Sequence, residues 1–248
     1  MRDGINDTAL GIDGCKAGWF FFRRDGATTT FGVAETVCEI CQSLPESTTA
    51  LIDMPIGLRQ RGKKERQCDV EARAVLGPRR SSVFAAPCRP VLTAKNYQQA
   101  LERNRRNTGR GLSRQSWNLV PKIREVDQLL RAEVAFRTVL REAHPELCLW
   151  GLAGGPMPDN KKTRDGFAQR MTILSILDQD AEALIAAAWL AHGGWDADRD
   201  DLVDAFVLML CASHGSRLRS IPAEPETDPH GLPMEMVYLP GLESPGVS

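Results

Sequence analysis

The stretch Ala9-Leu10-Gly11-Ile12-Asp13-Gly14 decides the fold, and Cys15-Lys16-Ala17-Gly18-Trp19-Phe20-Phe21-Phe22 continues it. This pattern predicts a short buried strand, a turn bounded by glycines and a second, strongly apolar strand. Asp13 lies at the end of the first strand, where a charged side chain gains little from packing. It therefore either reaches water or holds a ligand, and we expect the ligand to be a divalent metal ion.

The composition is that of an ordinary globular protein: 248 residues, 42% hydrophobic, 25% charged, with a net charge of −1. Such a balance gives no general attraction to nucleic acid or to membranes, so nucleic-acid binding would need a local basic patch. No apolar run approaches the roughly 20 residues that span a bilayer, and the N-terminus has no apolar signal core. We therefore expect a cytoplasmic protein with no membrane partner.

A single α/β domain over residues 1–248 is predicted from the order of the apolar segments. The first three strands are antiparallel, with Asp25-Gly26 as a hairpin turn, and the later strands are parallel. A helix is predicted over 35–44. The predicted strands cover 9–13, 18–23, 28–33, 49–56 and 136–142. The fourth strand is apolar up to Asp53, and the fifth ends at Glu142. Together they predict a mixed five-stranded sheet that is flanked by helices.

The segment 58–120, after the fourth strand, is rich in arginine and lysine and has only short apolar pieces. It predicts an irregular basic insertion with one or two short helices. Tyr97 and Trp117 add aromatic side chains of the kind that stack on nucleic-acid bases, so nucleic acid is the expected partner. The other interpretation is a solvated charged surface, because Glu65, Asp69 and Glu71 dilute the positive charge.

The second half of the chain is predicted to be mainly helical. Helices are expected over 121–135, with Pro121 in the first turn, and over 161–177 and 180–190. A Pro- and Gly-rich tail covers residues 222–248. Within the tail, residues 236–239 are expected either to add an edge strand or to lie over the surface.

Residues 201–212 predict a helix that is buried on most sides, because 202–212 is apolar nearly all round. Asp201 and Asp204 are three residues apart and so share a helix face. Acidic residues near a helix N-terminus are favourable by about 0.3–1 kcal/mol, which explains Asp201 better than Asp204. A buried carboxylate needs a cation, a metal or hydrogen-bond donors. Helix capping alone and a functional pair therefore both remain open.

Four carboxylates are predicted to form a metal site: Asp13, Asp53, Asp201 and Asp204. Mg²⁺ and Mn²⁺ prefer oxygen ligands, and a two-metal phosphodiester hydrolase needs about four carboxylates around its ions. Lys162 is a further catalytic candidate, because it could pair with a scissile phosphate or with the carboxylates. It could equally be a solvated lysine at a helix start.

The order of strands, helices and acids resembles the ribonuclease-H-like fold, and the placement of the acids is closest to its Holliday-junction resolvase branch. Five motifs carry a closer resemblance. They are Gly11-Ile12-Asp13-Gly14-Cys15-Lys16-Ala17-Gly18-Trp19, Ile52-Asp53-Met54-Pro55-Ile56-Gly57-Leu58, Glu142-Ala143-His144-Pro145-Glu146, Lys161-Lys162-Thr163-Arg164-Asp165-Gly166 and Asp200-Asp201-Leu202-Val203-Asp204-Ala205. In this order they resemble the family called domain of unknown function 429, whose members are described as predicted nucleases of ribonuclease-H-like fold. The resemblance covers roughly residues 9–212.

This resemblance implies a divalent-metal-dependent nuclease that uses Mg²⁺ or Mn²⁺. Asp13 would be the central bridging carboxylate, Asp53 a second ligand, and Asp201 or Asp204 would complete the set. Glu142 is a further catalytic candidate, with Glu146 behind it. In this segment the order departs from the simple resolvase pattern. His144 could activate water or hold a phosphate, or it could simply be a turn histidine before a proline.

Two other functions fit parts of the pattern. The actin-like and sugar-kinase proteins also carry an aspartate on the first strand, before a Gly-rich hairpin that contacts ATP phosphates. They usually need a duplicated second domain, and the sequence contains no internal repeat. Alternatively, the chain could be a non-catalytic module of the same fold that binds nucleic acid or a protein through the basic insertion.

Overall fold

A five-stranded mixed sheet forms the centre of the structure, a computed structural model that describes residues 8–42, 44–45 and 47–241. Its order is β3-β2-β1-β4-β5. The strands are β1 (Thr8–Cys15), β2 (Gly18–Asp25), β3 (Thr28–Ala34), β4 (Thr49–Ile52) and β5 (Leu140–Glu142). The first three are antiparallel neighbours, whereas β4 is parallel to both β1 and β5. The predicted mixed sheet is therefore confirmed.

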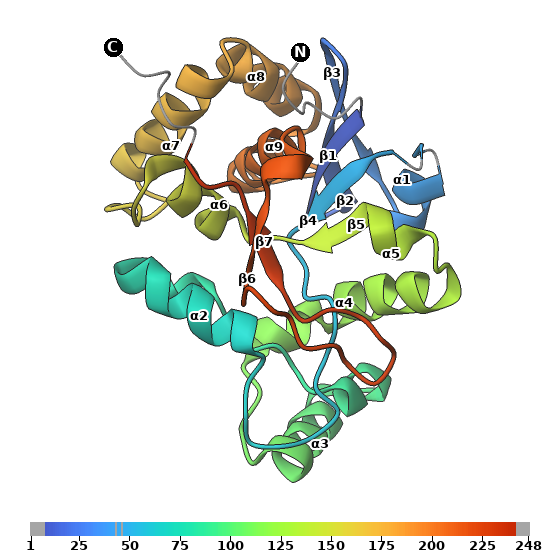
Figure 1. Cartoon of the computed structure of the whole chain (residues 1–248). Helices are drawn as coiled ribbons and strands as arrows, with labels where there is room; N and C mark the ends of the chain where they lie inside the picture. Colours follow the sequence, from blue (N-terminus) through green and yellow to red (C-terminus); the bar gives the residue numbers. More distant parts are fainter. Residues whose placement is uncertain (1–7, 43, 46, 242–248) are drawn as a thin grey trace.

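Helices cover both faces of this sheet (Figure 1). One face carries α6 (Pro145–Ala153), α7 (Arg164–Leu177), α8 (Ala181–His192) and α9 (Arg199–Ala212). The other carries α1 (Val37–Gln42) and α4 (Arg114–Ala132). In the part that the structure describes, no helix is long and apolar enough to cross a membrane.

Strand β1 is buried on both faces of the sheet. Its successive side chains point to opposite faces, and helices cover both. Leu10 and Ile12 pack in the apolar cluster that contains α1 and α4. Ala9 and Cys15 pack in the cluster that contains α9. Residue 13 falls on the α9 side by the same alternation, so the fold directs the Asp13 side chain toward α9.

Helix α9 is buried from Leu202 to Ala212, as the sequence predicts. It lies so close to β1 that a Cβ atom on Gly11 would come within 2.0 Å of the Ala205 carbonyl oxygen and 2.2 Å of the Met209 nitrogen. Glycine is therefore required here by the close approach of two backbones.

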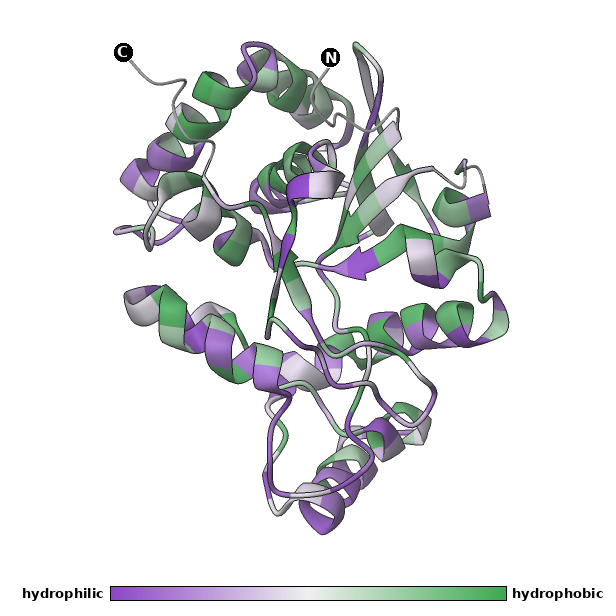
Figure 2. Cartoon of the chain, viewed as in Figure 1, coloured by the Kyte–Doolittle hydropathy of each residue, from purple (hydrophilic) through white to green (hydrophobic). Residues whose placement is uncertain are grey.

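The segment 58–120 is more helical than the sequence indicates. It contains α2 (Gln67–Leu76), α3 (Tyr97–Thr108), the first turns of α4 and the short 3₁₀ helices η1 (Gly77–Ser82) and η2 (Arg89–Thr93). Helices α2 and α3 lie in the lower half of Figure 1. Figure 2 shows that α3 is largely hydrophilic, in contrast to α8 and to the strands around β1.

Three predicted elements differ from the structure. The fourth strand, expected over 49–56, ends at Ile52, directly before Asp53. The helix expected from Pro121 begins at Arg114, because the Ser113 hydroxyl caps it by accepting from the Ser116 amide at 2.9 Å. Pro121 therefore lies inside α4. The strand expected over 136–142 is instead a short helix, α5 (Phe136–Val139), followed by β5. Only the three residues of β5 have partners on β4, from Ala50 to Ile52.

The tail from residue 222 is packed onto the domain as far as the structure describes it. Strand β7 (Met236–Tyr238) pairs with β6 (Arg219–Ile221), which follows the 3₁₀ helix η3 (Gly215–Arg217). Val237 is fully buried and bridges to Ala143, next to β5. Of the two possibilities for 236–239, a strand is correct, although its partner is β6 rather than the main sheet. Residues 242–248 of the predicted tail lie outside the described residues.

The change Gly11→Ala is expected to destabilise the fold by about 1–3 kcal/mol, the usual cost of overpacking a core. The added methyl group must push α9 away from β1, because the nearest atoms belong to backbone. Urea unfolding followed by circular dichroism measures this loss. Gly111→Ala is the control, because a Cβ at that position meets open space. Equal midpoints for the two variants would contradict the prediction.

Candidate metal centre

Three aspartates from separate elements meet at the ends of the central strands. Carboxylate oxygens of Asp13, Asp53 and Asp204 all lie within 4.8 Å of one another. Asp13 belongs to β1, Asp53 directly follows β4, and Asp204 lies in α9. Three of the four residues predicted as metal ligands are thus brought together.

The register of β1 and β4 explains why the first two carboxylates meet. Ile12 pairs with Ile52, and the Asp53 amide donates to the Ile12 carbonyl at 3.0 Å. The next residue on each parallel strand is an aspartate, so both acids lie at the same edge of the sheet. Because α9 touches β1 at Ala205, the neighbouring Asp204 is carried to the same place.

Burial and the neighbouring acids raise the pKa of two of these carboxylates, Asp13 and Asp53. Burial raises the pKa of Asp13 well above its usual value, and the charges of Asp53 and Asp204 raise it further. Burial also raises the pKa of Asp53; the charge of His144 opposes this rise, Asp204 adds to it, and Lys161 opposes it. Holding these acids together therefore costs free energy, which the charge of Lys161 offsets only in part.

This donor set fits Mg²⁺ or Mn²⁺. Both ions take carboxylate oxygens, and six ligands at about 2.0–2.1 Å from one ion are separated by roughly 3–4 Å. Oxygens that lie within 4.8 Å of one another need only small side-chain rotations to reach that spacing. The cavity beside them has a volume of about 390 Å³, which leaves room for water and a substrate group.

Asp201, the fourth predicted ligand, lies outside the cluster of three. Its Oδ2 accepts a hydrogen bond from the Asp198 amide at 2.8 Å, at the start of α9. Burial raises the pKa of Asp201 to about 6; the hydrogen bond from Asp198 opposes this rise, and nearby acids add to it. Its negative charge also contributes to the raised pKa of Asp13. The two acids of the Asp-x-x-Asp motif thus have different surroundings.

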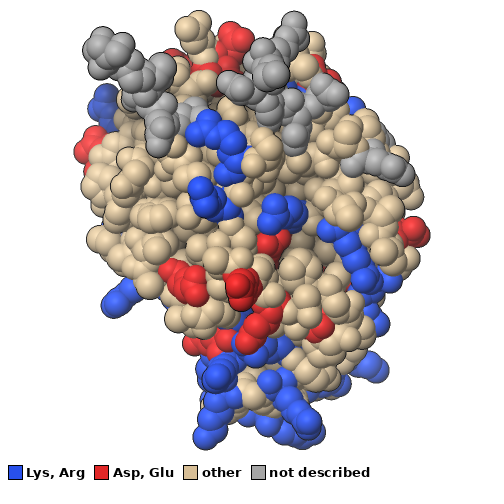
Figure 3. Space-filling view, viewed as in Figure 1, with Lys and Arg blue, Asp and Glu red and all other residues tan. Residues whose placement is uncertain are grey.

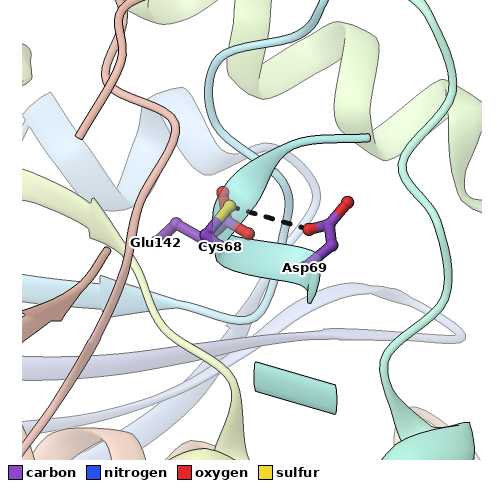
Figure 4. Close-up of side chains that lie close together, drawn as sticks. All are labelled: Cys68, Asp69 and Glu142. Atoms are coloured by element: carbon purple, nitrogen blue, oxygen red, sulfur yellow. Dashed lines mark hydrogen bonds between the residues drawn. The ribbon is translucent and has the colours of Figure 1, made fainter. Parts of the chain in front are cut away.

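Glu142 lines the same cavity, close to Cys68 and Asp69 (Figure 4), and its carboxylate is held by an arginine. Both of its oxygens accept from Arg66 at 2.7 Å, and Oε2 also accepts from the Ile56 amide at 2.6 Å. Burial raises the pKa of Glu142 to about 7, against the opposing charge and hydrogen bonds of Arg66. Cys68 and Asp69 complete a second group of potential ligands. Because Asp69 also accepts from Arg66, at 2.5 Å, the guanidinium already compensates this group.

Of the two adjacent lysines, Lys161 rather than Lys162 touches the carboxylates. Its Nζ lies 2.5 Å from an Asp204 oxygen and 3.4 Å from an Asp200 oxygen. Burial alone would lower the pKa of Lys161, but the charges of Asp204, Asp13 and Asp200 raise it overall, so the amine is positively charged. Lys162 is exposed and also lines the cavity. No pattern in the sequence distinguishes the two lysines.

The segment after β5 places two further groups in the cavity wall. His144 caps α6 by accepting the Glu146 amide at Nδ1, at 3.2 Å. Glu146 accepts two hydrogen bonds of 2.8 Å from Arg170, which is 1% exposed. The sequence did not indicate Arg170, because nothing in the pattern of α7 marks it as buried. His144 is thus a turn residue before Pro145 and also a residue of the cavity wall. Both interpretations made from the sequence therefore remain open.

Tyr97 and Trp117, the aromatic residues noted in the basic segment, contact each other and other residues of the same segment. The Arg114 guanidinium lies 3.8 Å from the centre of the Tyr97 ring, and Tyr97 contacts Trp117 edge to face. The Tyr97 hydroxyl donates to the Leu112 carbonyl at 2.8 Å. Figure 3 shows arginine and lysine side chains gathered at the lower end of the molecule, where Figure 1 places α3.

Comparison with curated proteins and with solved structures gives no match. Residues 11–227 match a family described as "Protein of unknown function (DUF429)". The matched range contains the three clustered aspartates as well as Lys161. Because it spans well over half of the 248 residues, the chain belongs to the DUF429 family.

Proposed function

We propose that this protein is a divalent-metal-dependent nuclease of ribonuclease-H-like fold that hydrolyses phosphodiester bonds in nucleic acid. The observation that carries the proposal is the meeting of Asp13, Asp53 and Asp204 beside one cavity. The sheet order β3-β2-β1-β4-β5 supports the fold assignment, because the acids sit on β1, after β4 and on the last long helix. This is the placement that the resemblance implies.

Asp13, Asp53 and Asp204 would hold Mg²⁺ or Mn²⁺. When bound, such an ion polarises the phosphodiester and orients the attacking water. Lys161 fixes Asp204 and offers a positive charge to a phosphate oxygen. His144 lines the same cavity, with Nδ1 accepting from the Glu146 amide and Nε2 near the Ser82 carbonyl, and is our candidate to contact a phosphate of the substrate.

In this proposal Glu142, Asp201 and Lys162 do not bind the metal ion but assist the site around it. Glu142 and Asp201 accept hydrogen bonds from the Ile56 and Asp198 amides, and so hold the backbone near Asp53 and Asp204. Lys162 is exposed at the cavity and is placed to meet a phosphate of the bound strand.

The proposal is tested by incubating the purified protein with Mn²⁺ and labelled single-stranded DNA, duplex DNA, branched DNA, RNA and an RNA–DNA hybrid. We expect cleavage of at least one substrate and complete inhibition by EDTA. Calorimetry should detect Mn²⁺ binding. At a Mn²⁺ concentration 100 times its dissociation constant, binding adds about 2.7 kcal/mol of stability, so the melting temperature should rise by about 5–10 °C.

Absence of both Mn²⁺ binding and cleavage would reject the proposal. Binding of ATP without any cleavage would instead favour the actin-like alternative. Metal-independent binding of nucleic acid without cleavage would favour a non-catalytic module.

A further inference from the structure

A second cavity, also of about 390 Å³, opens where α7 and α9 begin. It adjoins the first cavity across four residues that line both, Lys161, Lys162, Arg170 and Asp204, but Asp13 and Asp53 do not line it. Nothing in the proposed chemistry of the carboxylates uses this second space.

The charged groups around the second cavity are mainly positive. Two of its cations have partners: Lys161 pairs with Asp204 and Asp200, and Arg170 pairs with Glu146. The other three, Lys162, Arg164 and Arg199, have no ion pair within the described residues. The Arg199 guanidinium is held over the Phe167 ring, 3.9 Å from its centre. The cavity therefore presents positive charge that the protein itself does not neutralise.

The positions of the two arginines argue against a simple solvated surface. Arg164 and Arg199 are the first residues of α7 and α9. A helix has a positive electrostatic potential at its N-terminus, so a cation there is unfavourable and an anion is favourable. Of the acids in the first turns of these helices only Asp200 lines the cavity, and it pairs with Lys161. Arg164 and Arg199 therefore leave positive potential there that a bound anion would relieve.

A buried donor without an acceptor lies at the same cavity. Arg170 is 1% exposed and lines both cavities, and its Nε–H has no hydrogen-bond acceptor in the part of the chain that is described. Leaving a buried donor without an acceptor costs free energy, and the Nε atoms of Arg23, Arg79 and Arg89 are in the same state elsewhere in the structure. An oxygen-rich anion is the kind of ligand that could approach such a donor.

We propose that this second cavity binds a phosphate group, which Lys162, Arg164 and Arg199 contact. The identity of that group rests on the proposed function: in a nuclease it is a backbone phosphate that neighbours the scissile one. Lys161, shared by both cavities, then lies between the phosphate being cleaved and the phosphate being held. The second cavity would thereby fix the register of the strand over the carboxylates.

The test measures binding in EDTA, so that it does not depend on a metal or on cleavage. Fluorescence anisotropy follows labelled 12-nucleotide single strands of DNA and RNA at several NaCl concentrations. The double variant Arg164→Gln/Arg199→Gln is compared with Arg217→Gln/Arg219→Gln, which removes two exposed arginines that do not line either cavity. Both variants lose the same charge.

We expect the Arg164/Arg199 variant to bind about tenfold more weakly than the control variant. Its plot of log K against log salt should be shallower by about 0.7 for each backbone phosphate that the variant no longer neutralises. Its melting temperature should stay close to that of the wild type, because the removal of two cations from helix N-termini offsets the loss of the Arg199–Phe167 contact. Equal affinity of the two variants, or no binding by the wild type, would overturn the proposal.

The two proposals fail separately. If binding depends on Arg164 and Arg199 but no substrate is ever cleaved, the phosphate site stands and the nuclease function falls. If cleavage is observed but the two double variants bind alike, the nuclease function stands and the second cavity is not a phosphate site.

Discussion

Replacement of Asp13 by asparagine is expected to lower metal-dependent cleavage by about 10³-fold or more, equivalent to about 4 kcal/mol in the activation free energy. Asp13 lies within reach of both other carboxylates, so its loss removes the oxygen that links the acids of β4 and α9. Asparagine keeps the size of the side chain and an oxygen that can accept from the Gly14 amide, a bond of 2.7 Å in the structure. Initial rates with Mn²⁺ measure the effect.

The same variant should be more stable than the wild type in EDTA. The pKa of Asp13 is raised in the folded state, so the folded chain holds a proton that the unfolded chain has lost. The free energy of unfolding therefore falls as the pH rises from about 4 toward the pKa of Asp13 in the folded state. Above that pKa the destabilisation reaches its full value. Asparagine removes this penalty, and each kcal/mol regained raises the melting temperature by about 2–4 °C.

The advantage of Asp13→Asn should thus be largest at neutral and alkaline pH and vanish near pH 4. The exposed change Asp180→Asn serves as the control and should show no such trend. The proposed central role of Asp13 would be contradicted if the variant kept its activity within tenfold of the wild type. It would also be contradicted if the variant melted below the wild type in EDTA at pH 7.

The positions of Asp13, Asp53 and Asp204 were predictable because each rests on a local pattern. Two acids directly after apolar strands must meet at one edge if the strands are parallel neighbours. Asp204 stood out because an acid among buried apolar residues needs a partner. Lys161 has no such pattern: it precedes the N-cap Thr163 in a loop, and only the tertiary structure turns it, rather than Lys162, toward Asp204.

The fold departs from the sequence patterns where long-range contacts decide the structure. The tail after residue 222 has a composition typical of a surface segment, yet Asp228 holds it in place by accepting from the Leu58 amide at 3.1 Å and from Arg89. The partners lie 170 and 139 residues away in the sequence. Similarly, Glu142 was a catalytic candidate by its place at a strand end, but its oxygens are engaged by an arginine from the segment before α2.

That arginine, Arg66, should give the largest loss of stability. It is 3% exposed and donates to Glu142, to Asp69 and to the Ile56 and Gly57 carbonyls, so it joins α2 to β5 and to the chain after β4. Arg66→Met would leave two buried carboxylates without a counter-charge, at a cost of about 3–5 kcal/mol. Urea unfolding measures the loss, and the exposed change Arg80→Met is the control.

The loss in Arg66→Met should come from uncompensated charge rather than from missing volume, and two measurements separate these causes. Removing the charges as well, in Arg66→Met/Asp69→Asn/Glu142→Gln, should restore a large part of the stability. The single variant should also regain stability toward pH 4. Without Arg66 only the hydrogen bond from the Ile56 amide opposes the burial that raises the pKa of Glu142, so the folded chain keeps a proton there that the unfolded chain loses between about pH 4 and pH 7. A single variant as unstable at pH 4 as at pH 7 would show that packing dominates. Since Glu142 pairs with Ile52, the residue before Asp53, the same network also holds one wall of the proposed metal centre.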